Sequence, residues 1–361
     1  MKGVTSGYTE GMSNSLSRRE FLKLSWLSFG GLAFTPLDQR LPEEDRVRLE
    51  AIKVARVASH EEAIRREPSL RSPVVGTRRR DELVRVYEEI VSPSGPDHNP
   101  RWYRVIGGFM HTARLVPVET RYNPVVGSIR AGGEVFRVTV PFTQSLRYTQ
   151  SQGWTRLYRL YYLSNHWVMD VTEGPDKQPW YVIVDDLLKV EYMVPAAHLQ
   201  RIPPQEFEPI SPDVTNKYIE VSLKEQTVTC YENGEVVMHT DVSTGIPSQG
   251  PTSNGIPTET PAGEFRVSLK TPVRHMGDGA LTSDIFAYEL PGVPWTTFFT
   301  ETGVAFHGTY WHDNYGTRMS SGCVNMRPAE AHWLYRWTTP VDPYEPGKWH
   351  INGYGTLIRV F

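Results

Sequence analysis

The sequence predicts a mainly β chain that is divided into several domains. Its 361 residues include 29 glycines and 28 prolines, which is typical of a chain with many turns. Apolar and polar residues alternate at 219–224, as they do in a strand with one buried face. Asn233-Gly234 separates two such runs and predicts a tight hairpin. A chain of this length exceeds one ordinary core, so we expect two or three domains.

Charge and cysteine content narrow the classes of function. A formal net charge of −3 excludes a typical nucleic-acid binder, and we interpret the basic segment 76–85, "GTRRRDELVR", as a solvated charged loop. Two cysteines exclude a disulfide framework. One bridge between Cys230 and Cys323 stays open for an oxidising compartment, although "QTVTCYE" places Cys230 in a predicted core strand.

Residues 1–37 have the pattern of a targeting segment. Arg18-Arg19 precedes a Phe-Leu-Lys run and an apolar stretch, 24–34, that is too short to span a bilayer comfortably. The pattern resembles a twin-arginine signal, which implies export of the folded protein to a cell wall or periplasm-like space. The alternative is a basic cap before a short buried helix. Signal cleavage and retention as an anchor both stay open, and residues 38–52 are interpreted as a connector.

Two stretches of similar layout follow, at residues 53–120 and 121–203. Each contains a Trp-Tyr pair that begins a strand and a Val-Pro pair that ends the unit. This weak repeat predicts two copies of one small β-barrel module. The modules resemble the bacterial src-homology-3-like modules carried by cell-wall enzymes, but two unrelated antiparallel units with the same short pattern are the alternative.

The third part of the chain begins after a proline-rich linker, residues 204–215. We assign residues 216–361 to a C-terminal domain of successive strands. The segment "RPAEAHWLYRWTTP" predicts its one convincing helix, with Pro328 in the first turn and Pro340 beyond the end.

Candidate catalytic groups lie in "GVAFHGTYWHDNYGTRMSSGCVNM", residues 303–326. His307 ends an apolar run, and Cys323 follows sixteen residues later. An imidazole can take the proton of a thiol nucleophile, and Gly322 lets a substrate backbone approach the sulfur. Backbone amides at this turn suit a developing oxyanion, and a helix that begins directly after Cys323 would favour the thiolate.

Other interpretations of this segment remain. A lone cysteine is commonly an inert buried residue, yet Cys323 lies among polar residues and glycine. A zinc site of His307, His312 and Cys323 has neither the usual ligand spacing nor a fourth ligand. His312 is expected to be solvated or to lie behind the site residues rather than to act as the base.

The segments "HGTYWHDNYG" and "MSSGCVNM" resemble the catalytic signature of the YkuD-type L,D-transpeptidases. The segments "TPAGEFRV" and "IEVSLKEQTVTCYENGEVV" resemble a further turn and the opening hairpin of this family, so that the resemblance covers residues 216–361. It implies a β-sandwich-like catalytic domain with the cysteine at the mouth of a groove.

The resemblance implies Cys323 as the nucleophile and His307 as the general base. It further implies that Gly308, Ser321 and Gly322 orient the base and hold the oxyanion, and that Trp311, Ser320 and Asn325 bind substrate. The family usually has a histidine where this chain has Ser321, which can donate a hydrogen bond but carries no charge. We expect activity to survive this difference with an altered acylation rate or selectivity.

The function implied is that of an exported cysteine-dependent acyltransferase. It would act on peptidoglycan stem peptides at the cell-envelope surface and form 3-3 cross-links through a thioester, with release of terminal D-Ala. The scheme needs no metal and no other cofactor, and we expect a monomer. Water as the acceptor would make the protein an L,D-carboxypeptidase. The alternative from another class is a wall-binding module with a weakened catalytic domain, which Ser321 favours.

Overall fold

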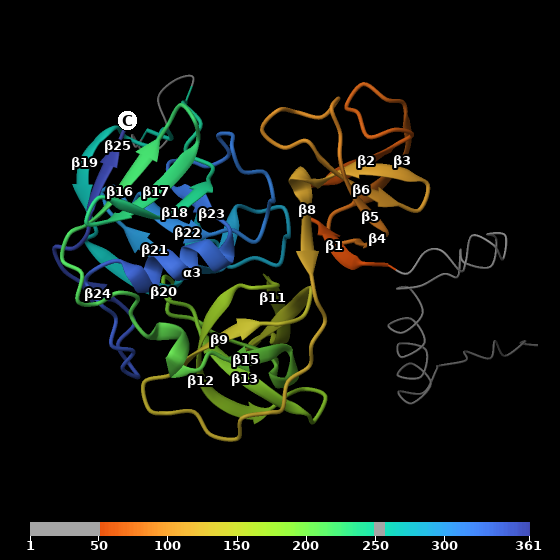
Figure 1. Cartoon of the computed structure of the whole chain (residues 1–361). Coiled ribbons are helices and arrows are strands. Elements are labelled where there is room, and N and C mark those ends of the chain that lie inside the picture. Colours follow the sequence, from red (N-terminus) through yellow and green to blue (C-terminus); the bar gives the residue numbers. More distant parts are fainter. Residues whose placement is uncertain (1–50, 249–256) are drawn as a thin grey trace, which may run out of the picture. The chain divides into compact units, whose positions relative to one another are not determined.

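The computed structural model describes residues 51–248 and 257–361 (Figure 1). The predicted export signal, 1–37, and nearly all of the connector lie outside the described residues. Strands dominate the described part, and its one α-helix is α3 (Pro328–Trp337), which confirms the predicted mainly β class. None of the helices described is long and apolar enough to cross a membrane.

Residues 53–118, here named the N-terminal module, form two antiparallel sheets. The sheet orders are β4-β1-β8 and β3-β2-β7-β6-β5, and a common core that includes Tyr103 and Met110 is buried between them. The strands are β1 (Lys53–Val57), β2 (Glu61–Arg65), β3 (Val74–Arg79), β4 (Leu83–Val86), β5 (Glu88–Val91), β6 (Arg101–Val105), β7 (Gly108–His111) and β8 (Leu115–Val118).

Residues 134–201, here named the middle module, form one antiparallel sheet in the order β11-β10-β14-β13-β12-β9-β15. Its strands are β9 (Glu134–Val138), β10 (Phe142–Thr149), β11 (Gly153–Tyr161), β12 (Asn165–Glu173), β13 (Pro179–Val184), β14 (Glu191–Pro195) and β15 (Leu199–Arg201). In the described part of the chain no sheet closes into a barrel, so the predicted pair of small barrels is not confirmed.

Residues 217–360, here named the C-terminal domain, contain two five-stranded sheets, in the orders β18-β17-β16-β25-β19 and β23-β22-β21-β20-β24. Side chains of both sheets meet in one hydrophobic core, as in a sandwich, and α3 packs against β21 and β22 (Figure 1). The strands are β16 (Lys217–Ser222), β17 (Thr227–Glu232), β18 (Glu235–Asp241), β19 (Gly263–Arg266), β20 (Leu269–Gly277), β21 (Glu289–Phe298), β22 (Ala305–Gly308), β23 (Val324–Met326), β24 (Ile351–Asn352) and β25 (Leu357–Val360).

Two local predictions in this domain are confirmed. Asn233 and Gly234 both have positive φ, 53° and 90°, and connect β17 to β18 as the Asn-Gly signal indicates. Pro328 is in the first turn of α3, and the helix buries Leu334 and Trp337. Cys230 is buried in β17, and both cysteines are free thiols.

The interpretation of 76–85 as a solvated loop is wrong, because 76–79 belong to β3, 83–85 belong to β4, and the turn between these strands buries Asp81. This carboxylate is buried and accepts from Arg56 of β1 at 2.9 Å and from Arg159 of β11 at 2.7 Å. Arg56 also donates to the carbonyl oxygen of Tyr310 in the C-terminal domain at 2.8 Å. The acidic side chain therefore pairs with two arginines at a junction of all three parts, which a count of charges along the chain does not reveal.

Candidate active site

Two adjacent parallel strands bring His307 and Cys323 together. In the register of β22 and β23, Phe306 is opposite Val324, which places Cys323 beside Ala305. Residues two apart on a strand share a face, so the side chains of Cys323 and His307 project from the same face of the sheet. The fifteen residues between them finish β22 at Gly308 and then form a loop that returns the chain to the neighbouring strand position.

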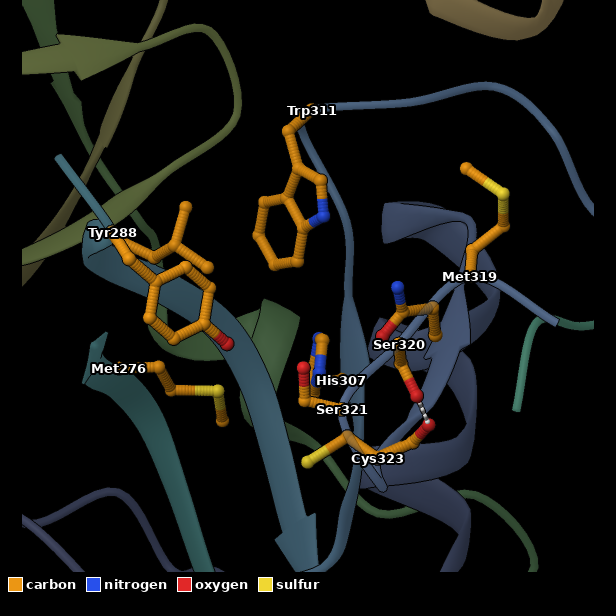
Figure 2. Close-up of a pocket in the computed structure, with 10 residues that line it drawn as sticks. Met276, Tyr288, His307, Trp311, Met319, Ser320, Ser321 and Cys323 are labelled. Carbon is orange, nitrogen blue, oxygen red and sulfur yellow. Dashed lines mark hydrogen bonds between the residues drawn. The ribbon is translucent and has the colours of Figure 1, made fainter. Parts of the chain in front are cut away.

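Both side chains line a cavity of about 100 Å³. Figure 2 shows the sulfur of Cys323 turned toward the side on which Met276 and Tyr288 lie, with the ring of Trp311 above His307. The lining residues are Met276, Tyr288, Leu290, His307, Trp311, Met319, Ser320, Ser321, Cys323 and Asn325. The implied substrate residues Trp311, Ser320 and Asn325 are therefore all at the cavity.

The imidazole of His307 is buried and its orientation is fixed. Nδ1 lies 3.1 Å from the carbonyl oxygen of Gly308, and because a carbonyl can only accept, Nδ1 carries the proton. Nε2 is then the unprotonated nitrogen of the neutral ring. Burial disfavours the imidazolium and lowers the pKa of His307 to about 4, so Nε2 is available as a proton acceptor at neutral pH.

Gly308 occupies a position where a side chain does not fit. A Cβ there would lie 2.9 Å from the ring of Pro294 and 3.0 Å from the Cα of Pro328. The absence of a side chain lets the carbonyl of this residue lie under the His307 ring. The structure therefore places Gly308 where it can orient the base.

The resting thiol of Cys323 is protonated. Burial raises its pKa to about 11, and a hydrogen bond from the backbone N–H of Ala305 offsets only part of that effect. The expected helix directly after Cys323 is wrong, because β23 intervenes and α3 begins at Pro328. The helix dipole acts only over the first turn, so it cannot supply the thiolate stabilisation expected from the sequence.

The loop before Cys323 is held by two hydroxyl groups. Ser320 donates to the carbonyl oxygen of Cys323, and the N–H of Gly322 donates to the Ser320 hydroxyl at 3.2 Å. Buried Thr260 donates to the carbonyl oxygen of Gly322 at 2.7 Å and accepts from the N–H of Gly245 at 2.9 Å. Gly322 has φ +121°, which favours glycine.

This bonding selects one backbone donor for an oxyanion. In a trans peptide the C=O and the following N–H point in opposite directions. Because Thr260 holds the Gly322 oxygen, the N–H of Cys323 points away from Thr260. The N–H of Gly322 is occupied by Ser320, so the available donor belongs to Cys323 rather than to Gly322.

His312 is buried rather than solvated, with 1% of its surface exposed. Its Nδ1 accepts from the N–H of Asn314 at 3.2 Å, and burial lowers its pKa to about 3, so the neutral ring carries its proton on Nε2. Nε2 lies 3.0 Å from the side-chain amide of Asn325. Because Nε2 donates its proton, the amide must be oriented with its oxygen toward His312. His312 therefore acts behind Asn325, which is the second of the two expectations for it.

The amide of Asn325 is only partly used by the protein. One of its two polar atoms contacts His312, whereas the other is buried and has no hydrogen-bond partner among the described residues. With the oxygen on His312, the free atom is the amide nitrogen, a donor at the cavity wall. This donor is therefore available to a polar group that enters the cavity.

Ser321 contacts a residue that the sequence did not reveal as part of the site. Its hydroxyl shares a hydrogen bond with the phenol of Tyr288. Burial raises the pKa of Tyr288, the neighbouring Cys323 raises it further when its thiol is ionised, and the bond to Ser321 lowers it. Ser321, which stands where the family usually has histidine, therefore contacts the opposite wall of the cavity at Tyr288.

Three residues of the cavity wall were not predicted from the sequence: Met276, Tyr288 and Leu290. They come from the β20–β21 hairpin, and none is near the motif along the chain. The zinc alternative gains no support: no group of three or more His, Cys, Asp or Glu side chains in residues 51–248 and 257–361 is placed to hold a metal ion.

Comparisons with known proteins assign the C-terminal part of the chain. Residues 216–349 match the family model of the YkuD L,D-transpeptidase catalytic domain. No curated protein matches the chain significantly.

The solved structures that are similar to this chain include three L,D-transpeptidases. The NMR structure of the catalytic domain from the E. faecium L,D-transpeptidase is 29% identical over 40% of this chain and 97% of that chain, with a TM-score of 0.29. A crystal structure of the Xylanimonas cellulosilytica L,D-transpeptidase is 22% identical over 43% of this chain and 65% of that chain, with a TM-score of 0.29. The L,D-transpeptidase from Mycobacterium smegmatis is 18% identical over 68% of this chain and 99% of that chain, with a TM-score of 0.31.

Proposed function

We propose that the domain matched at residues 216–349 makes this protein a peptidoglycan L,D-transpeptidase that forms 3-3 cross-links through a thioester on Cys323. The observation that carries the proposal is the placement of a neutral His307 and the Cys323 thiol on one face of β22 and β23, at one cavity. A thiol and a proton acceptor at a shared cavity are the minimum requirement for acyl transfer through cysteine.

The first half-reaction acylates the enzyme. Nε2 of His307 takes the thiol proton as Sγ of Cys323 attacks the carbonyl carbon of the third residue of a donor stem peptide. The N–H of Cys323 donates to the oxyanion that forms. The bond to the terminal D-Ala then breaks, His307 returns the proton to the departing amine, and a thioester remains on the sulfur.

The second half-reaction transfers the acyl group. An amine of a neighbouring stem attacks the thioester carbon while Nε2 of His307 takes one of its protons. The C–S bond breaks, and the proton passes to the sulfur, so that the resting thiol and neutral imidazole are restored. One amide bond is broken and one is formed, and the scheme balances without an external energy source.

General-base attack suits the electrostatics of the resting site better than a preformed ion pair. At neutral pH the thiol of Cys323, with a pKa near 11, and the imidazole of His307, with a pKa near 4, are both uncharged. Proton transfer therefore accompanies attack, when the developing oxyanion offsets the charge on the imidazolium. The proposed mechanism therefore starts from a protonated thiol instead of the thiolate expected from the sequence.

Export and substrate belong to the same proposal. The twin-arginine pattern of residues 1–37 supports delivery of the protein to the cell envelope, where stem peptides are found. Trp311 and Asn325 at the cavity supply an aromatic face and a free amide donor for a peptide.

Product analysis with purified tetrapeptide muropeptides tests the proposal. We expect 3-3 cross-linked dimers and free D-Ala from the wild type, and neither from Cys323→Ala. Tripeptide alone would mean that water is the acceptor and that the protein is an L,D-carboxypeptidase. Unchanged cross-linking by Cys323→Ala would overturn the assignment of the nucleophile.

Intact mass after incubation with a carbapenem separates an enzyme from a wall-binding module. The wild type should gain one adduct, which Cys323→Ala abolishes. Cys230 is a built-in control, because it is fully buried in β17 and should not react in either protein. A wild type without any adduct would favour the binding module.

A further inference from the structure

The β20–β21 hairpin forms one wall of the active-site cavity. Met276 near the end of β20 and Tyr288 just before β21 line the cavity (Figure 2). Leu290 near the start of β21 lines it as well. The hairpin also contacts the middle module, since β20 and β21 both pack against β12. Whatever fixes the hairpin against the middle module therefore fixes one wall of the cavity.

His275, next to Met276, lies between acidic groups of two different parts of the chain. Its Nδ1 is 2.6 Å from Asp185 Oδ2 of the middle module, and its Nε2 is 2.7 Å from Glu289 Oε2 on β21. Its backbone N–H donates to Asp186 Oδ1 at 2.6 Å. The imidazole and both partner carboxylates are buried, with 0%, 2% and 4% of their side chains exposed.

The geometry assigns the charge of this group. A carboxylate oxygen can only accept, so each nitrogen of His275 must donate, and a ring with two N–H groups is an imidazolium. Asp185 is fixed from its other side, because its Oδ1 accepts from the amides of Leu187 and Leu188 at 3.0 and 2.8 Å. Burial alone would lower the pKa of His275, but the bonds to Asp185 and Glu289 outweigh it and raise the pKa.

The other groups that face His275 are known. The ring of Tyr158 meets the imidazole edge-on at 5.3 Å, and His166 is kept neutral by burial, which lowers its pKa to about 3. Arg274 donates to Asp186 at 3.3 Å, and burial raises the pKa of Asp186 to about 6. The neighbours therefore include no second cation in direct contact with the imidazolium.

The same two parts of the chain meet again at the base of the hairpin. Asn165 of β12 donates to the carbonyl oxygen of Pro272 on β20 at 3.0 Å. Gly292 of β21 has φ +74°, and a Cβ on it would lie 2.3 Å from the ring of His166. Tyr158 also donates to the carbonyl oxygen of Ala280 in the connection between β20 and β21 at 3.1 Å. The middle module thus contacts the hairpin at its base, its middle and its connection.

We propose that the middle module positions the active-site wall, and that the His275 imidazolium, held between Asp185 and Glu289, is the positioning residue that locks the β20–β21 hairpin to it. The inference rests on the proposed function for its effect on catalysis. Its structural part, the docking of the hairpin, does not depend on which reaction the site performs.

Loss of this lock should misplace one wall and leave the nucleophile and base intact. A displacement of about 1 Å at a substrate-positioning wall can lower a rate by roughly 10²-fold. His307 and Cys323 come from β22 and the turn before β23, which the lock does not touch. We therefore expect His275→Gln to raise the KM for the donor peptide more than it lowers kcat.

Hydrogen exchange tests the docking directly. His275→Gln should speed amide exchange in residues 276–290 by roughly 10-fold or more relative to the wild type. The control is His239→Gln, which changes an exposed histidine on β18 whose Nδ1 lies 2.8 Å from the Thr229 hydroxyl and should leave this segment unchanged. Glu289→Gln keeps the side-chain size, removes the second carboxylate, and covers the case in which His275→Gln does not fold.

The pH dependence of KM distinguishes a positioning role of His275 from a purely structural one, which would leave KM independent of its protonation. The raised pKa of His275 means that the lock is complete below about pH 6.5 and is lost as pH rises through the higher folded value. An NMR titration should show His275 protonated above pH 6.5 in the wild type, and Asp185→Asn should lower its midpoint. The KM of the wild type should rise over the same interval, and that of His275→Gln should not.

The results distinguish this inference from the proposed function. If His275→Gln shows faster exchange in 276–290 but the wild type has no transpeptidase activity, the lock stands and the proposed function is overturned. If the wild type is an active transpeptidase but His275→Gln has the same amide exchange and the same KM as the control His239→Gln, the proposed function stands and the lock is overturned. A titration midpoint of His275 at or below 6.5 would also overturn it.

Discussion

Nδ1 of His307 donates to the carbonyl oxygen of Gly308 at 3.1 Å, and this single bond decides which nitrogen of the ring can act as a base. It leaves Nε2 unprotonated at neutral pH, because the pKa of the buried ring is about 4. The relationship has consequences that can be measured in the pH dependence of the site.

Acylation should depend on the neutral form of His307. As pH falls toward 4 the imidazole becomes protonated and can no longer take the thiol proton, so the acylation rate should fall tenfold per pH unit below that value. Single-turnover acylation between pH 3.5 and 8 measures this limb. A limb near 6.5 would contradict the buried, neutral base.

The thiol of Cys323 should react as an undissociated group in the resting enzyme. With a pKa near 11, its alkylation by iodoacetamide should rise without a plateau between pH 7 and 10. His307→Gln should leave this profile nearly unchanged, because the two groups form no ion pair at rest. A plateau below pH 8 would show that a thiolate–imidazolium pair exists instead.

Thr260 should support the oxyanion donor through the Gly322 carbonyl. Thr260→Val keeps the shape and removes the hydroxyl that fixes this peptide, and we expect kcat to fall by roughly 10- to 10²-fold, less than the loss of a direct donor. Thr260→Ser restores the hydroxyl and should recover most of the rate. Equal losses in both variants would mean that packing, not the hydrogen bond, is responsible.

Gly308 should not tolerate a side chain. Gly308→Ala forces a methyl group against Pro294 and Pro328, and overpacking of this kind costs about 1–3 kcal/mol in the free energy of unfolding. Gly127→Ala is the matched control, since a Cβ there meets no atom within 4 Å. Thermal unfolding of the two variants compares them, and similar midpoints would contradict the tight contact.

Asp81 should be far more sensitive than its neighbour Glu82. Asp81→Asn leaves Arg56 buried without its charge partner, and breaking a buried pair in this way typically costs about 3–5 kcal/mol. Glu82→Gln removes only an exposed pair with Arg78, which is worth about 0–1 kcal/mol. Denaturant unfolding of both variants tests the difference, and equal stabilities would place Asp81 in solvent after all.

Local patterns predicted the parts of the site that are close in sequence. The apolar run before His307 and the Gly-Cys turn were enough to select these two residues as candidates, because each is determined by a short segment, and the structure brings both side chains to one cavity. The Asn233-Gly234 hairpin and the helix at Pro328 were predicted for the same reason, since a turn and a helix cap depend on neighbouring residues.

Ionisation was not predictable in this way. The sequence suggested a thiolate because a helix was expected directly after Cys323, but the pKa of a thiol responds to burial by the whole fold. The solvated loop at 76–85 failed for the same reason. The sequence pattern predicts an exposed Asp81, but the side chain is buried where Arg56 of β1 and Arg159 of β11 donate hydrogen bonds to it.

By itself the sequence determined a β-rich chain and a cysteine–histidine pair, because alternation, turns and short motifs are local properties. Only the tertiary structure decided that the β20–β21 hairpin supplies the second wall of the cavity and that Asp185 of the middle module meets His275. The contact between Asp185 and His275 joins residues 90 positions apart, so it depends on how sheets pack, a global property that no local pattern encodes.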